Sequence, residues 1–194
     1  MRVPEVGTAS GGGGGAEIRT ARLLLRPFAE GDLGALVAYR RDPEVARYQS
    51  WSADYTMADA ERLLVEHVGL RLGRPGAWVQ LAAVEAAGGE VVGDCASHVL
   101  REPPHTAEIG VTLARAHQGR GLAHEALRGL VTALFERHAI RRVIAQADDR
   151  NLAVHRLLDR LGFRLEARFV EADWFKGEWA TLRVYAVLHT DWEA

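Results

Sequence analysis

Alternating apolar and polar residues along the chain predict a series of β-strands separated by short turns. Residues 77–87 and 90–99 flank Gly88 and Gly89, and two strands joined by such a pair are typical of a hairpin. A second hairpin is expected around Lys176 and Gly177. The strands expected elsewhere span residues 21–28, 106–113, 142–147, 163–170 and 179–188.

Apolar residues spaced three or four positions apart predict four helices between these strands. Their expected starting points are Asp32, Thr56, Gly121 and Asn151. Thr56 and Asp59 form a capping-box pattern, and the helix after them is expected to reach Gly73 with Val68 and Leu72 on its buried side. The third helix is expected to end near residue 138 and the fourth at Gly162.

The order of these elements predicts an α+β or mixed α/β domain with a mainly antiparallel sheet. One strand leads into two helices, three strands follow, and a strand–helix–strand–helix unit precedes the closing hairpin. We expect one domain over residues 16–194, because no repeat or internal linker is present. Residues 1–15 include five consecutive glycines and are expected to form a flexible tail.

Composition narrows the possible partners and compartment. The chain has 194 residues, of which 48% are hydrophobic and 26% charged, so it can bury a core without disulfides or metals. Lys and Arg number 24 against 26 Asp and Glu, so no nucleic-acid partner is expected. A single cysteine, Cys95, excludes an internal disulfide and favours a reducing, cytoplasmic compartment. No apolar run reaches about eighteen residues, so no membrane span is expected.

The segment most informative about chemistry runs from strand 106–113 through a loop into the third helix. The first N–H groups of a helix have no internal partner and carry a positive partial charge, which makes them a site for a phosphate. Gly119 and Gly121 permit a tight turn there, although a plain strand-to-helix turn would also use them. A P-loop is excluded because no Gly-Lys-Ser/Thr follows, and His124 stands where a dinucleotide fingerprint needs glycine or alanine.

Gln118, Gly121 and Ala123 fit the pattern Gln/Arg-x-x-Gly-x-Gly/Ala. This segment resembles the acyl-CoA-binding signature of the GNAT superfamily of N-acyltransferases. The resemblance continues in order over residues 18–190, and the branch most similar to this chain contains the ribosomal-protein alanine and serine N-acetyltransferases. It includes the opening strand at 20–28, the strand segment 107–111, the helix end at 151–163 and the hairpin at 174–179.

The resemblance implies a GNAT-like fold, a twisted sheet of about seven strands with about four helices, and acetyl-CoA as co-substrate. The strand backbone at Val111, Thr112 and Leu113 is implied to pair with the pantetheine of the co-substrate. Asn151 is implied to contact the pantetheine or thioester, and it is equally suited to cap its helix. The implied pyrophosphate cradle is formed by Gln118, Gly119, Arg120, Gly121, Leu122 and Ala123. Arg120 either contacts phosphate through its charge or is a solvated loop cation.

The implied reaction is direct attack of a primary amine on the thioester of acetyl-CoA in a ternary complex. A base has to take a proton from the amine, and Glu108, on the strand leading to the thioester, is the first candidate. The alternative for Glu108 is an exposed strand carboxylate. Asp94 is a second candidate, sharing a strand face with His98, although a solvent-facing side of that strand is favoured.

The proton donor to the leaving thiolate is where this chain departs from the family pattern. Many GNAT enzymes have tyrosine where this chain has Leu158, and the ribosomal-protein branch has serine where it has Val154. His155 shares a helix face with Asn151 and is a candidate acid or base, the alternative being a surface histidine. Otherwise the proton comes through water, or the protein is a catalytically weak acyl-CoA-binding module.

The acceptor is left open among a protein N-terminus, a lysine and a small-molecule amine, and a homodimer is possible. No metal site is expected, because the other histidines do not form a ligand spacing with one another or with carboxylates. Aromatic residues near the acceptor side of the family fold are candidates for an apolar rim, with core packing as the alternative. They are Trp51, Tyr55, Trp174 and Trp179.

Overall fold

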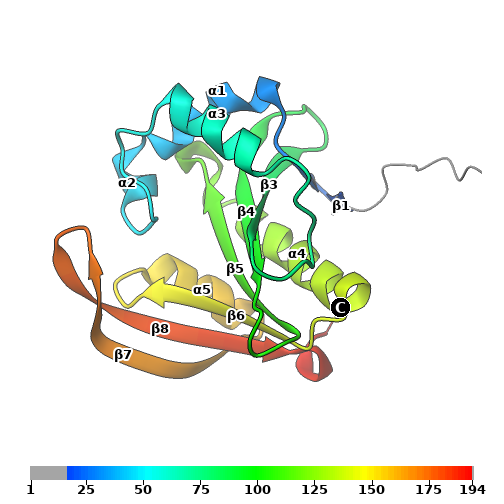
Figure 1. Ribbon diagram of the computed structural model, residues 1–194, viewed down its shortest axis with the longest axis vertical. Helices are drawn as coiled ribbons and strands as arrows, with labels where there is room; N and C mark the ends of the chain where they lie inside the picture. Colours follow the sequence, from blue (N-terminus) through cyan, green and yellow to red (C-terminus); the bar gives the residue numbers. More distant parts are fainter. Residues whose placement is uncertain (1–16, 194) are drawn as a thin grey trace, which may run out of the picture.

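A computed structural model describes residues 17–193, and its centre is one eight-stranded sheet flanked by five α-helices (Figure 1). The strands are β1 (Ile18–Arg19), β2 (Leu23–Arg26), β3 (Trp78–Glu85), β4 (Val91–Val99), β5 (Thr106–Leu113), β6 (Arg142–Asp148), β7 (Arg164–Phe175) and β8 (Glu178–Leu188). The helices are α1 (Leu33–Arg40), α2 (Pro43–Ala46), α3 (Met57–Glu66), α4 (Leu122–His138) and α5 (Leu152–Arg160). The expected tail, residues 1–15, lies outside the described residues.

The sheet has the order β1-β2-β3-β4-β5-β6-β8-β7, and every neighbouring pair is antiparallel except β5 and β6. This confirms the mixed, mainly antiparallel architecture. The two expected hairpins are present as the β3–β4 and β7–β8 pairs. The parallel pair arises because α4 carries the chain back across the sheet between β5 and β6, as a strand–helix–strand crossover requires.

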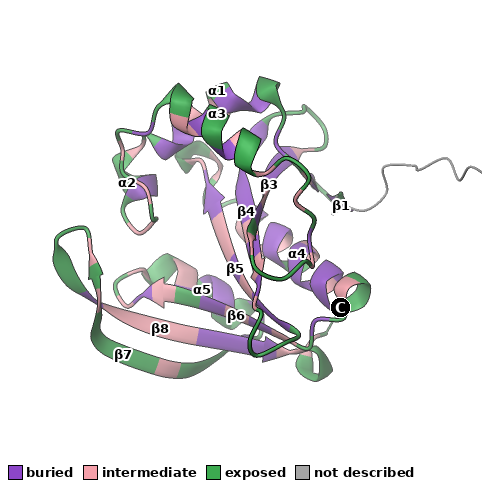
Figure 2. Cartoon of the chain, viewed as in Figure 1, coloured by how far each residue is buried: buried purple, intermediate pink, exposed green. Residues whose placement is uncertain are grey.

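Helices cover both faces of the sheet, and each face has its own hydrophobic core. The larger core packs α4 and α5 against the strands, with Leu127, Leu130 and Leu134 of α4 almost fully buried. Burying each such side chain contributes roughly 1.5–3 kcal/mol. The smaller core joins α1 and α3 to β3 through residues such as Leu36 and Ala82. Figure 2 shows both buried layers and the exposed edge strand β7.

Three details differ from the sequence prediction. A two-residue strand, β1, precedes β2, and a four-residue helix, α2, follows α1 with Asp42 as its N-cap. Helix α3 ends at Glu66 instead of reaching Gly73, so Val68 is exposed while Leu72 is buried from a loop. The helix ends at Glu66 with His67 as its C-cap, and the turn that follows contains Gly69 at a positive φ of 76°, so Val68 lies in this turn and not on the buried helix face.

The predicted helix starts are confirmed by their caps. Thr56 and Asp59 form the capping box of α3, and the Asn151 side chain accepts a hydrogen bond from the Val154 N–H at 3.3 Å. None of the helices among residues 17–193 combines the length and apolar character needed to cross a membrane.

Candidate functional site

The two parallel strands at the centre of the sheet pair over only three residues and then separate. Thr106, Ala107 and Glu108 of β5 lie opposite Arg142, Val143 and Ile144 of β6. Beyond Glu108, β5 stays with β4 and β6 stays with β8, so the strands diverge (Figure 1). The β5 edge over residues 109–113 therefore has no strand partner on the β6 side among the described residues. Such an edge can pair with an extended ligand that carries amide groups.

The divergent end of β5 leads to the start of α4 through the loop 114–121, which includes a short 3-10 helix at Arg115–His117. Gly119 and Gly121 have φ values of 75° and 77°, in the left-handed region that glycine adopts without strain. Gly121 is the N-cap, and in the described structure no side chain caps this helix. Leu122 is buried, which anchors the first turn, and Ala123 packs partly against the same core. The first N–H groups of α4 are thus available to an anion.

Side chains of the loop hold this helix start in place. The Gln118 Nε2 donates to the Leu113 carbonyl at 3.1 Å, which ties the loop to the end of β5. The Arg120 guanidinium pairs with Glu85 at 2.7 Å and lies 2.9 Å from the His117 ring nitrogen. The Arg120 side chain is about half exposed while it pairs with Glu85, and its contact with phosphate stays a prediction. Val111, Thr112 and Leu113 are in β5 as predicted, paired with β4 but without a strand on the β6 side, and their contact with pantetheine stays a prediction.

A group of hydrogen bonds that the sequence did not predict connects α4 to the turn between β1 and β2. Glu125 accepts hydrogen bonds from the Thr20 hydroxyl, the Arg22 N–H and the Arg22 Nε, each at 2.6 Å. Partial burial raises the pKa of Glu125, but these hydrogen bonds outweigh it and lower the pKa overall. The partners are more than 100 residues apart, so no local pattern could have indicated them.

Glu108 lies where β5 and β6 begin to separate, half-buried, and accepts a hydrogen bond from Gln146 of β6 at 3.2 Å. It faces His98 across the β4–β5 pair. Burial raises the pKa of Glu108 above the usual range, opposed by His98 and by the Gln146 hydrogen bond. A half-buried carboxylate with a raised pKa, at the point where two strands separate, suits a general base.

Asp94 is not on a solvent-facing side, so that part of the sequence prediction is wrong. Its carboxylate is buried beneath α1, where the Tyr39 hydroxyl donates to it at 2.5 Å and the Arg40 guanidinium lies 3.6 Å away. Burial raises the pKa of Asp94, and Arg40 and Tyr39 oppose that shift. The Arg40 guanidinium stacks on Trp51 at 3.9 Å, so Trp51 and its neighbour Tyr55 hold a buried cation.

His155 is buried as well, which corrects the expectation of a surface histidine. Its ring stacks on Tyr185 of β8 at 5.6 Å, and its Nε2 lies 3.3 Å from the Asp149 carbonyl. The Nδ1 atom is buried without a hydrogen-bond partner in the described structure. Helix α5 is strongly amphipathic, and His155 falls on the side that meets the sheet. Val154 and Leu158 pack in the main core on the same helix.

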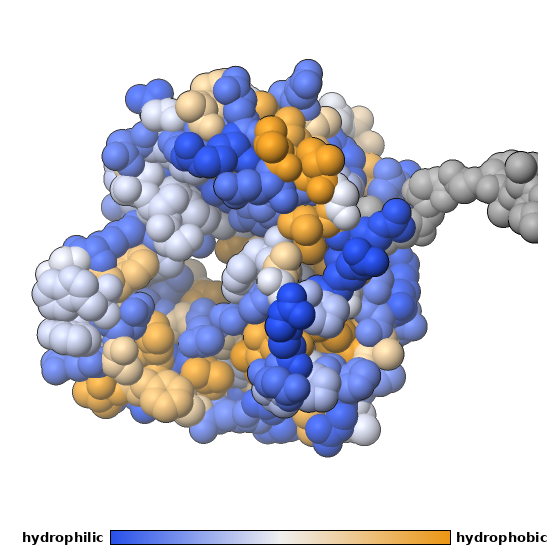
Figure 3. All heavy atoms as spheres, in the orientation of Figure 1, coloured by the Kyte–Doolittle hydropathy of each residue, from blue (hydrophilic) through white to orange (hydrophobic). Residues whose placement is uncertain are grey.

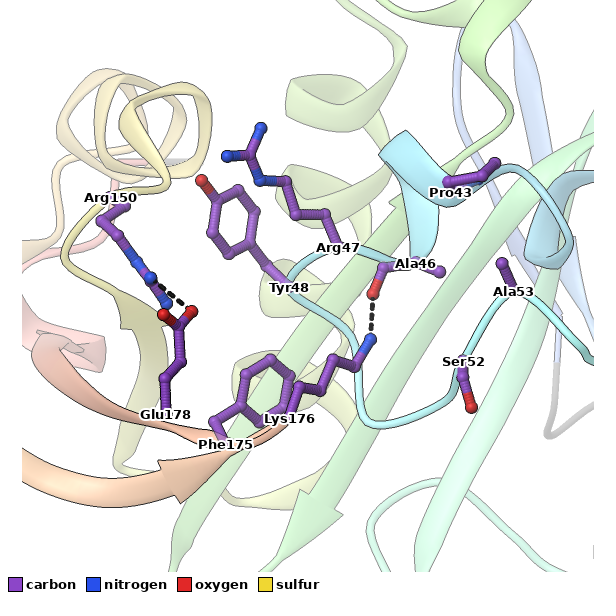
Figure 4. Close-up of a pocket in the computed structure, with 10 residues that line it drawn as sticks. All are labelled: Pro43, Ala46, Arg47, Tyr48, Ser52, Ala53, Arg150, Phe175, Lys176 and Glu178. Carbon is purple, nitrogen blue, oxygen red and sulfur yellow. Dashed lines mark hydrogen bonds and ion pairs between the residues drawn. The ribbon is translucent and has the colours of Figure 1, made fainter.

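Opposite the divergent strands, the α2 region meets the tip of the β7–β8 hairpin. Lys176, at that tip, donates hydrogen bonds to the carbonyls of Ala46 at 2.6 Å and Trp51 at 2.7 Å. A cavity of about 320 Å³ lies between them, lined also by Tyr48 and Arg150 (Figure 4). Figure 3 shows the surface hollowed between the two halves of the molecule. Sequence reasoning missed these lining residues because they come from four separate segments.

The hairpin aromatics Trp174 and Trp179 are exposed and contact each other edge to face, with ring centroids 5.3 Å apart. Cys95 is fully buried, and burial raises the pKa of its thiol, as expected for a cysteine that only packs. Among the described residues, no three His, Cys, Asp or Glu side chains are grouped closely enough to hold a metal ion.

Comparison with known proteins agrees with this geometry. The family model of the acetyltransferase (GNAT) domain matches residues 22–164. The chain is 27% identical over 173 residues to the uncharacterized N-acetyltransferase p20 of Bacillus licheniformis, covering 89% of this chain and 96% of that protein.

Solved structures show the same fold. A GNAT-family acetyltransferase from Bacillus anthracis superposes with a TM-score of 0.80 at 24% identity, covering 89% of this chain and 98% of that one. Spermidine N-acetyltransferase from Vibrio cholerae, solved with CoA and spermine, superposes with a TM-score of 0.76 at 18% identity, covering 88% of this chain and 98% of that one. The matched domain, the divergent parallel strands and the uncapped helix start together place this chain in the GNAT family of acetyltransferases.

Proposed function

We propose that this acetyltransferase moves the acetyl group of acetyl-CoA to a primary amine. One observation carries the proposal: β5, whose edge beyond Glu108 is unpaired on the β6 side, leads through the loop 114–121 to the uncapped N-terminus of α4. The pantetheine amides would pair with the backbone of Val111, Thr112 and Leu113. The pyrophosphate would lie against the N–H groups from Gly119 to Ala123. Asn151, at the start of α5, would border the thioester.

Glu108 is the proposed general base. An amine with a pKa of about 10 is mostly protonated at neutral pH, so it has to lose a proton before it attacks. Its nitrogen then bonds to the thioester carbon, the carbon–sulfur bond breaks, and the thiolate of CoA leaves. A backbone N–H near Leu113 would stabilise the oxyanion that develops in between. Holding both substrates in one cleft supplies much of the remaining acceleration.

The thiolate takes its proton either from His155 or from water, since Val154 and Leu158 have no proton to donate. The buried, unpartnered Nδ1 of His155 is the observation that keeps this residue in the mechanism. Replacement of His155 by Gln should lower kcat at unchanged KM if the imidazole is the donor. Unchanged kcat in a variant that still folds would assign the step to water.

The function is tested by following free-thiol release from acetyl-CoA with a panel of amines. Glu108→Gln should lower kcat/KM by roughly a hundredfold or more, with calorimetric acetyl-CoA affinity unchanged. Glu136→Gln, an exposed position on α4, is the matched control. Because burial raises the pKa of Glu108, this base becomes protonated at a higher pH than an ordinary glutamate. As the pH is lowered, kcat/KM should therefore start to decrease at a higher pH than it would with a glutamate of ordinary pKa. If kcat/KM of Glu108→Gln still decreases over the same pH range, another residue is the base.

A second function follows from the side chains of α5. Val154 and Leu158 occupy the positions where the family usually has a serine or tyrosine that donates a proton. Their side chains cannot do so, which favours a catalytically weak acyl-CoA-binding module. Acetyl-CoA binding without thiol release from any amine would support that function. Absence of acetyl-CoA binding would contradict both.

A further inference from the structure

Arg22, in the turn between β1 and β2, connects the first turn of α4 to the loop that precedes this helix. Its Nε donates a hydrogen bond to the Glu125 carboxylate at 2.6 Å, and its Nη1 donates to the Arg120 carbonyl at 3.0 Å. Its Nη2 lies 3.6 Å from the position that a Cβ on Gly121 would occupy. One guanidinium therefore bonds both to α4 and to the loop, beside the N-cap of the helix.

The direction in which this guanidinium donates is set by Glu125. The same carboxylate accepts hydrogen bonds from the Arg22 N–H and from the Thr20 hydroxyl, both at 2.6 Å, and only 16% of the Glu125 side chain is exposed. The N–H groups of a planar guanidinium form a rigid fork, so a bond that fixes Nε also fixes the direction of Nη1. Glu125 thus aims Nη1 of Arg22 at the carbonyl of the loop.

The hydrogen bond to the Arg120 carbonyl also sets the direction of the Gly121 N–H. The two groups belong to one peptide unit, which is planar and trans, so they point in opposite directions. Among residues 17–193, the Gly121 N–H donates to no carbonyl. It therefore points away from Arg22 and the opening strands, where it can donate to a ligand at the start of α4.

The charge of Arg22 contributes less to anion binding than this geometry does. Glu125, in the first turn of α4, pairs with Arg22 at 2.6 Å and offsets its positive charge. Half of the Arg22 side chain is exposed, so water further weakens its attraction for a phosphate. What Arg22 supplies to the helix start is a fixed orientation of one peptide unit.

Resting on the proposed function, we infer that Arg22 is a positioning residue of the pyrophosphate site. It holds the peptide between Arg120 and Gly121 so that the Gly121 N–H donates to the pyrophosphate of acetyl-CoA. Glu125 positions Arg22 in turn. This role is confined to the pyrophosphate, and it involves neither the pantetheine amides nor the 3′-phosphate of the co-substrate.

The test compares the affinities of three acetyl thioesters. Acetyl-CoA is the complete ligand, acetyl-dephospho-CoA lacks the 3′-phosphate, and S-acetylpantetheine lacks the pyrophosphate and the adenosine. Calorimetry gives the affinity of the first two, and competition with acetyl-CoA gives that of the third. Arg22→Ala should bind acetyl-CoA and acetyl-dephospho-CoA about tenfold more weakly than wild type, the effect of one hydrogen bond to a charged group. Its affinity for S-acetylpantetheine should be unchanged.

Arg22→Lys separates geometry from charge. Lysine keeps the positive charge but has no rigid fork that reaches Glu125 and the Arg120 carbonyl together, so this variant should bind acetyl-CoA almost as weakly as Arg22→Ala. Glu125→Gln should show a smaller loss with the same dependence on the ligand, because it removes the ion pair that aims the guanidinium. Arg19→Ala is the matched control, since that side chain is 74% exposed and pairs with Glu17, and it should bind all three ligands as wild type does.

Four outcomes would overturn the inference. They are an equal loss for all three ligands in Arg22→Ala, a loss for acetyl-CoA alone, wild-type affinity for acetyl-CoA in Arg22→Lys, and wild-type affinity for every ligand in Arg22→Ala. The first would show a general structural role, the second direct binding of the 3′-phosphate, and the third an effect of charge alone. Circular dichroism checks that the variants fold, and if Arg22→Ala does not, Arg22→Lys and Glu125→Gln carry the same comparison. Failure of the wild-type protein to bind any of the three ligands would instead contradict the proposed function.

Discussion

At the scale of single residues, Asp94 is a charged group buried between β4 and α1. It is the buried counter-charge of Arg40, which is itself enclosed by Trp51 and Tyr55. The Arg40 Nε and one Nη are buried without hydrogen-bond partners, so the attraction to Asp94 and the aromatic faces are its main compensation. Breaking a buried pair by removing one partner leaves an uncompensated charge in a region of low dielectric.

Asp94→Asn should therefore destabilise the protein by roughly 3–5 kcal/mol, although asparagine keeps the shape and an acceptor for Tyr39. Urea unfolding followed by tryptophan fluorescence measures the change. Asp54→Asn, at an exposed position, should stay within about 0.5 kcal/mol of wild type. Equal stabilities for the two variants would show that the Asp94–Arg40 pair contributes nothing net.

At the scale of elements, the start of α4 depends on a backbone conformation as well as on unpaired N–H groups. Gly121 has space around it, since a Cβ would meet only Arg22 at 3.6 Å. Its φ of 77° is what requires glycine. Gly34 in α1 is the opposite case, because it lies in a right-handed helix and a Cβ there would meet nothing within 4 Å.

Gly121→Ala should lose about 1–2 kcal/mol of unfolding free energy, because alanine is strained in the left-handed region. It should also weaken acetyl-CoA binding, since relief of that strain moves the first N–H groups of α4. Gly34→Ala should gain roughly 0.4–1 kcal/mol and bind acetyl-CoA as wild type does. Denaturant unfolding and calorimetry test both, and equal acetyl-CoA affinities in the two variants would contradict the role assigned to this turn.

At the scale of the whole molecule, a single lysine joins the two sides of the cleft. Lys176 is the one lysine in the sequence, and it bonds the β7–β8 hairpin to the segment after α1, about 125–130 residues away. Partial burial lowers the pKa of its ammonium group. Lys176 also lines the cavity between these two segments.

Replacing Lys176 by Met should loosen this connection without unfolding the core. Amide hydrogen exchange should become faster in residues 46–52 and 174–178 and stay unchanged in α4, because the lysine contacts only the former segments. Lys176→Arg keeps the positive charge and should show an intermediate effect. Unchanged exchange at the hairpin tip would mean that other contacts hold the two sides together.

The sequence was sufficient for most of the elements and for the family. Capping at Thr56 and Asn151, the glycine turn before α4 and the alternation in the hairpins act over a few neighbouring residues, so their effects are readable locally. The predicted end of α3 was wrong because the apolar spacing continues past Gly69, whereas the helix ends at Glu66. The short helix α2 has too few residues to produce a periodic pattern.

Some features of the candidate site could be predicted from the sequence, and others depend on the tertiary structure. The order of strands and the motif from Gln118 to Ala123 follow from the chain alone, because both depend on local spacing. The burial of Asp94 and His155, the separation of β5 from β6 and the cavity beside the hairpin tip depend on partners far apart in the sequence, such as Tyr39 and Asp94, which are 55 residues apart. Only tertiary packing brings such groups together, since burial depends on which distant side chains exclude water from a position.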